Sequence, residues 1–384
     1  MNVMMHKNLQ TQNTIKAQDA FFPAACVAAI VLTALAQAER LGLIPWAQRL
    51  TGIGHAHEML FGFVLALICG YTLGKLTVNK IIMMLALWLS ARVSYLLLSN
   101  GIISEVLNMS FTAWVIWHIL PRFMAAKKWR NRMIGPLLLA IFSFPTSWFI
   151  SIHFMDVAST QTLIPALLIL LIMLMAFIAG RMLAPALAGE MHQQHYELKA
   201  RVQPRIEAAL LLIPALAFPL SIHPKTQILA ACAMSLMTAF LLIRLFRWEF
   251  WRCAHRSDLM TLVAGYFWLV LSTLFLSHAF AYGAVDFAFL HVITIGAIGT
   301  LSSVVILKYS LDKHSHPSII HYSSAAFILF ATLCRLMAAK SQTPHLWLNL
   351  SLAFWSLNYC MVLFIWQQGF QRSRSKKHPN QQLK

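Results

Sequence analysis

Twelve apolar stretches, each about as long as a membrane-spanning helix, constrain this chain more than any other feature, because a helix needs about 20 mostly apolar residues to cross a bilayer. The stretches lie at 21–41, 59–78, 81–99, 103–120, 134–155, 162–183, 206–222, 226–246, 259–281, 287–307, 319–339 and 346–367. Hydrophobic residues make up 59% of the chain and charged residues 11%, unlike the average soluble domain. The sequence therefore predicts an all-α, polytopic membrane protein with about twelve transmembrane helices.

Lysine and arginine are concentrated on one side of this predicted membrane pattern. If the N-terminus is cytoplasmic, 24 of the 30 basic residues fall on the inner side and four on the outer side, with Arg92 and Arg335 inside the membrane. Positive residues accumulate in the cytoplasmic loops of membrane proteins. The pattern predicts that both termini are cytoplasmic, and the formal charge of +18 reflects topology rather than nucleic-acid binding.

The polar ends of the chain flank this membrane region. We expect a cytoplasmic N-terminal segment at 1–20, a twelve-helix transmembrane domain at 21–368 and a basic cytoplasmic tail at 369–384. The tail lacks apolar periodicity, so we expect it to be irregular and to lie near the anionic lipid of the inner leaflet. Membrane lipid is thus the first expected partner.

Several histidines fall near the outer ends of the stretches. His55 and His57 open the second stretch, His278 closes the ninth, and His291 lies one turn into the tenth. Ionisable residues inside a membrane are costly and usually face a bundle interior or a water-filled site. Their similar depth favours one shared metal or haem pocket, and the alternative is a set of interfacial polar tips.

The stretch HAHEMLFGF, residues 55–63, contains two of these histidines. In a regular helix His55 and His57 point about 200° apart, so they cannot bind one metal from the same face. Either His55 lies in an extended entry and folds back, or only one histidine faces inward, and we favour His57. Glu58 is placed to orient an imidazole through its second nitrogen.

The stretch FLHVITIGAIGTLSS, residues 289–303, places a strip of small residues after His291. Gly296 and Gly299 either permit close helix packing, the commoner case, or let a flat macrocycle lie against the backbone. The two arginines inside the membrane also need partners. They can pair with an acidic residue such as Glu39 or Glu58, cap carbonyls, or hold a haem propionate.

These stretches, together with WLSARVSYLL, KWRNRMIGPLL, AGRMLAPAL, RLFRWEFWR and GYFWLVL, resemble the NnrS family of bacterial haem- and copper-containing membrane proteins associated with nitric oxide stress. The resemblance implies a multi-pass protein of the bacterial inner membrane that binds haem and copper and acts in the response to nitric oxide or nitrosative stress. It assigns no reaction, so enzymatic activity stays open.

Residue by residue, the resemblance implies a cofactor site drawn from the two histidine stretches. The cofactor-site candidates, which also include the outer-side histidine and the two membrane arginines, are His55, His57, Glu58, His278, His291, Arg92 and Arg335, and the metal ligands among them are His55, His57 and His291. One departure concerns the position three residues before Tyr266, where family members often carry histidine and this chain has Val263.

Two other functions remain open. A transporter of a small molecule or metal ion fits twelve spans, and it predicts helix breaks at corresponding positions of two halves. Pro214 and Pro219 interrupt the seventh stretch, and no matching break is visible in the first. An accessory membrane subunit is the third possibility, with histidines that serve packing alone.

Overall fold

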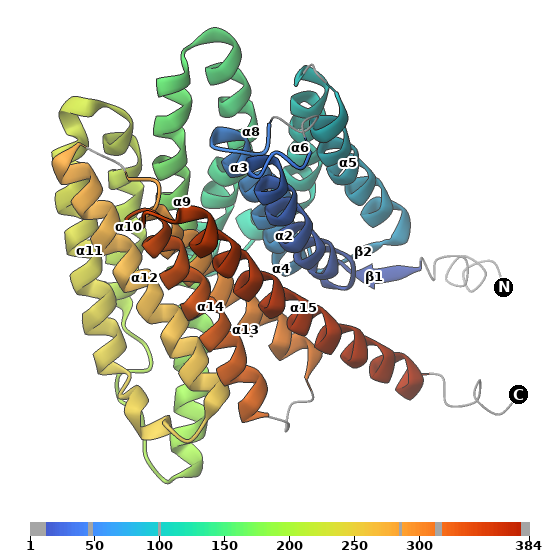
Figure 1. The fold of residues 1–384 in the computed structure, drawn as a ribbon. Helices are drawn as coiled ribbons and strands as arrows, with labels where there is room; N and C mark the ends of the chain where they lie inside the picture. The colour runs from blue at the N-terminus through green and yellow to red at the C-terminus, as the bar shows by residue number, and fades with distance from the viewer. Residues whose placement is uncertain (1–12, 45–48, 99–100, 284–285, 312–316, 378–384) are drawn as a thin grey trace, which may run out of the picture. The chain divides into compact units, whose positions relative to one another are not determined.

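The computed structural model describes residues 13–44, 49–98, 101–283, 286–311 and 317–377 (Figure 1). Within this described part, twelve helices are long and apolar enough to cross a membrane, which confirms the predicted all-α polytopic fold. The chain divides into two compact units, Met1–Thr146 and Ser147–Lys384. We describe each unit by itself.

The first unit begins with a short antiparallel pair of strands, in which Thr14 lies opposite Thr77. Its elements are β1 (Thr14–Lys16), α2 (Gln18–Arg40), α3 (Ile53–His57), the π-helical segment η2 (Glu58–Val64), α4 (Leu65–Thr72), β2 (Lys75–Thr77), α5 (Val78–Leu97), α6 (Ile102–Met124), α7 (Trp129–Arg132) and the first part of α8 (Ile134–Phe154). Helix α2 packs against η2 and α4, and α5 packs against α6.

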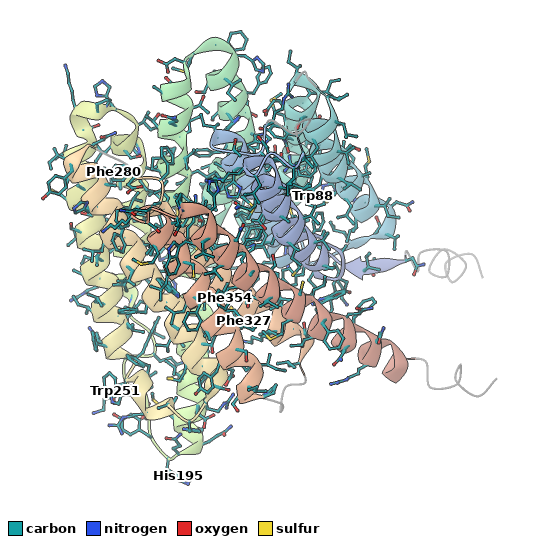
Figure 2. The ribbon with its side chains drawn as sticks, in the orientation of Figure 1. Trp88, His195, Trp251, Phe280, Phe327 and Phe354 are labelled. Carbon is teal, nitrogen blue, oxygen red and sulfur yellow. The ribbon has the colours of Figure 1, made fainter. Side chains whose placement is uncertain are left out.

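Helix α5 shows why polar groups point into this unit. Met84, Trp88 and Arg92 recur at four-residue spacing and are buried, whereas Ile82 and Leu89 on the opposite side are exposed. In a membrane the exposed apolar side chains face lipid, so the helix presents lipid-compatible residues outward and its arginine inward. Figure 2 labels Trp88 on this inward face.

The second unit is built around a helix of 37 residues, α9 (Val157–Gln193), which packs against α10 and α12. The other elements are α10 (Pro204–Ile222), η3 (Pro224–Thr226), α11 (Gln227–Arg247), η4 (Phe250–Cys253), α12 (Ser257–Tyr282), the π-helical segment η5 (Val292–Ala297), α13 (Ile298–Ser310), α14 (Ser318–Ala338) and α15 (Pro344–Lys377). Figure 1 shows α10, α11 and α12 side by side. Phe327 of α14 and Phe354 of α15, labelled in Figure 2, hold that helix pair together with ring centroids 6.4 Å apart.

Two boundaries differ from the sequence prediction. The second span covers Ile53–Thr72 rather than 59–78, so His55 and His57 are helical and do not lie in an extended entry. Helix α15 continues through Lys377, so the basic tail is helical as far as that residue instead of irregular. Residues 378–384 and 1–12 lie outside the described part.

Candidate functional site

Both histidine stretches contain the same backbone irregularity. A π-helical segment begins directly after His57 and another directly after His291, and each carries a glycine five residues beyond the histidine, Gly62 and Gly296. π-Helical turns are rare and occur mostly as short insertions at functional sites. The two histidines that the sequence analysis favoured are thus each followed by a backbone feature that is typical of functional sites.

The imidazole of His57 lies between two carboxylates. Its Nδ1 is 2.9 Å from Glu58 Oε1, and its Nε2 is 3.2 Å from Glu105 Oε1. Both His57 and Glu58 are 1% exposed, which confirms that His57 faces inward. A neutral imidazole has only one N–H. The two contacts are therefore favourable together only when the cluster holds an additional proton, on the imidazole or on a carboxyl group.

Arg92 joins the same cluster from α5. Its Nε lies 3.1 Å from Glu58 Oε2, and its Nη2 donates to Asn108 Oδ1 of α6. Asn108 meets the arginine because α5 packs against α6, and Glu105, three residues earlier on the same buried face of α6, is the residue that contacts His57. Of the alternatives that the sequence left open for Arg92, the structure shows pairing with Glu58.

Aromatic side chains close this cluster. The Tyr95 ring stacks on His57 at 4.5 Å with an interplanar angle of 15°, and the Phe61 ring meets it edge-on at 4.9 Å. Trp88 donates its indole N–H to the Gly62 carbonyl at 2.9 Å. Such packing holds the imidazole in one orientation.

His291 has different surroundings. Its side chain is half-buried, and its Nδ1 lies 2.9 Å from the Phe287 carbonyl, one helical turn earlier. A carbonyl can only accept, so Nδ1 carries the proton, and the lone pair of the neutral ring is on Nε2. A backbone carbonyl on Nδ1 is a common way of fixing the tautomer of a metal-binding histidine.

The small-residue strip beyond His291 is filled by side chains. A methyl group added at Gly296 would lie 2.7 Å from the Trp268 ring, and one at Gly299 would lie 2.8 Å from Ile328. Of the two explanations for the strip, the contacts favour close packing.

The remaining predicted residues are not gathered into these clusters by any contact described. His55 is half-buried in α3, and His278 is exposed, with its ring 4.5 Å from that of Tyr282. Arg335 is half-buried in the last turn of α14. Cofactor binding by these three residues stays a prediction.

Sequence reasoning missed Glu105, Asn108 and Tyr95. Glu105 had a signal, because it is an acidic residue inside the apolar stretch 103–120, and such residues are candidates for functional sites. Its spacing of three from Asn108 also places both residues on one helix face. Only the packing of α6 brings that face to His57.

Outside the membrane spans, the second unit has a separate exposed ion pair. Glu249 Oε2 lies 2.7 Å from Arg252 Nε and accepts from the Tyr196 hydroxyl at 2.8 Å. The hydrogen bonds from Arg252 and Tyr196 lower the pKa of Glu249. The same contact with Glu249 raises the pKa of Tyr196.

Within either described unit, no three His, Cys, Asp or Glu side chains are arranged to hold one metal ion. The family model described as NnrS protein matches residues 20–373, nearly the whole chain. No curated protein is similar enough in sequence to extend the comparison. With its twelve candidate spans and this match, the chain belongs to the NnrS family, a family of membrane proteins associated with the nitric oxide response.

Proposed function

We propose that this protein binds haem in the bacterial inner membrane and acts in the response to nitric oxide or nitrosative stress, with His291 as a ligand. The observation that carries the proposal is the hydrogen bond from His291 Nδ1 to the Phe287 carbonyl, which leaves Nε2 as the basic nitrogen. Haem iron held by an axial histidine can bind diatomic gases such as nitric oxide. The protein's own part is to fix the tautomer and direction of this imidazole.

His57 fits a different role. Both of its nitrogens face carboxylates, so ligation would require it to give up the contact with Glu105. We propose that the cluster of His57, Glu58, Arg92 and Glu105 instead serves as a buried, charge-balanced group that orders α3, α5 and α6. Glu105 Oε2 and Asn108 Nδ2 are buried without a hydrogen bond to a described residue, so they can bind a water molecule or polar ligand.

Haem suits the donors better than a bare copper ion. Copper needs several donors from the protein, and neither described unit supplies three together. Haem contributes four nitrogens itself and needs one or two side chains. The proposal therefore assigns haem to the His291 side and treats copper as a further metal for elemental analysis.

The test is an optical spectrum of the detergent-purified protein, oxidised and reduced, with and without nitric oxide, alongside iron and copper analysis. We expect a Soret band that shifts with the gas, and its loss in His291→Ala. His118→Ala is the matched control, because His118 makes the same hydrogen bond to a carbonyl four residues earlier, at 2.9 Å from Trp114. Full haem occupancy in His291→Ala would refute the ligand, and a folded wild type without iron or a Soret band after haem addition would refute the function.

A specific observation favours a second function, transport of a small molecule or metal ion. The π-helical segments interrupt the second and tenth spans, and helices with an irregular backbone are typical of transporter sites, although these two spans do not hold corresponding positions in two halves of six spans. Metal uptake into proteoliposomes that hold the haem-free protein tests this alternative. Uptake equal to that of empty vesicles, for each metal tried, would count against it.

A further inference from the structure

In the second unit, three stretches that are distant in the sequence meet around Arg244, which lies in the last turn of α11. The guanidinium is buried, with 5% of the residue exposed. A methyl group added at Gly180 of α9 would lie 2.6 to 2.7 Å from its atoms, so it occupies the space that the glycine leaves. The Trp248 ring lies 4.8 Å from its Cζ. Arg244 is thus held in place on two sides.

Hydrogen-bonding groups around this guanidinium lack partners. Two donors, Arg244 Nε and Trp248 Nε1, are fully buried and make no hydrogen bond to any residue that the structure describes. One acceptor, Gln203 Oε1, is also buried without such a hydrogen bond and is not a donor to an anion. Tyr266, whose ring is 5.2 Å from that of Trp248, brings its buried hydroxyl beside Arg244. Buried donors are nearly always satisfied in folded proteins, so a group of them at one place indicates a bound acceptor.

The charges at this place limit what the acceptor can be. Glu207 Oε1 lies 3.4 Å from Arg244 Nη2 and is one-fifth exposed, so the carboxylate occupies one edge of the guanidinium and leaves the Nε edge. The buried guanidinium therefore favours a small anion, and the existing carboxylate disfavours more than one negative charge.

We propose that the Arg244 cluster binds one small monovalent anion, of the size and charge of nitrate, at the Nε edge of the guanidinium. The indole N–H of Trp248 and the hydroxyl of Tyr266 are the further donors. Gly180 is required because any side chain there would displace the guanidinium.

The first test titrates sodium nitrate into the full-length, detergent-purified protein, replacing sodium gluconate at constant ionic strength, and follows thermal stability and tryptophan fluorescence. We expect a saturable stabilisation by nitrate. Trp248→Phe keeps the ring and removes one charge-assisted hydrogen bond, so it should weaken nitrate binding about tenfold. Trp366→Phe, which alters a tryptophan stacked on Phe370 in α15, should leave binding unchanged.

A second variant separates an anion site from a purely structural ion pair. Glu207→Gln removes the competing carboxylate, so it should melt at a lower temperature in gluconate, regain stability in nitrate, and bind nitrate about tenfold more tightly than the wild type. Stability that does not respond to nitrate in either the wild type or Glu207→Gln would overturn the proposal, and so would equal nitrate affinity in the wild type and Trp248→Phe.

Discussion

The two π-helical segments have the same backbone conformation, but the histidines that precede them have different hydrogen-bond partners. Each begins after a histidine and carries a glycine at the fifth following position, yet His57 is enclosed by two carboxylates and His291 bonds to a backbone carbonyl. The first arrangement stabilises positive charge on the ring, and the second keeps a proton on Nδ1, so the lone pair of the neutral form lies on Nε2. The comparison teaches that the neighbouring helix, more than the local motif, decides what a histidine can do.

Among the variants that test this comparison, removal of Arg92 should cause the largest loss of stability. Arg92→Leu removes the guanidinium from Glu58, which keeps only its contact with His57, and breaking a buried ion pair in this way costs about 3–5 kcal/mol of unfolding free energy. Thermal or denaturant unfolding in detergent measures the loss. Lys127→Leu, at an exposed position of the same unit, should change stability little.

If Arg92→Leu were as stable as the wild type, the cluster would not order the first unit. The double variant Arg92→Leu/Glu58→Gln should regain part of the lost stability, since it removes the unpaired charge as well as its partner.

The two glycines should differ in how they tolerate alanine. At Gly296 the new methyl group would meet the rigid Trp268 ring at 2.7 Å, so Gly296→Ala should cost about 1–3 kcal/mol. At Gly62 the nearest atoms, at 3.0 and 3.1 Å, belong to the flexible side chains of Leu32 and Arg92, so the cost should be smaller. Paired unfolding measurements check the order, and a larger loss in Gly62→Ala would show that the cluster around Arg92 is the more rigid of the two.

Removal of the exposed ion pair between Glu249 and Arg252 should cause the smallest loss of stability. This pair serves as a reference for ion pairs in contact with water. The pKa of Glu249 is lowered in the folded protein, so its contribution to stability is complete above its unfolded pKa and is lost as the pH falls through the lower folded pKa. The stability difference between the wild type and Glu249→Gln should therefore shrink from neutral pH towards pH 3, measured by melting temperature at each pH. A stability difference that does not change with pH would mean that the charge of Glu249 does not contribute to stability.

Much of the fold could be predicted from the sequence, because apolar stretches of membrane-spanning length allow few structures other than helices in a bilayer. The inward position of His57 also followed from residue type and depth, whereas Glu58 was one of several partners that the sequence allowed for Arg92. The start of the second span did not follow, because Gly54 and the histidines lower its hydropathy although α3 already begins at Ile53.

The sequence by itself determined the twelve helices, their apolar surfaces and which residues are too costly to face lipid. Only the tertiary structure decided the partners of those residues: that Glu105 and Asn108 of α6 meet His57 and Arg92, that the π-helical turns follow both histidines, and that Gly180, Arg244 and Trp248 converge. The physical reason is that hydrophobic length and burial cost are properties of single residues and segments, whereas a hydrogen bond or ion pair requires two atoms within about 3 Å, and helix packing alone sets that distance.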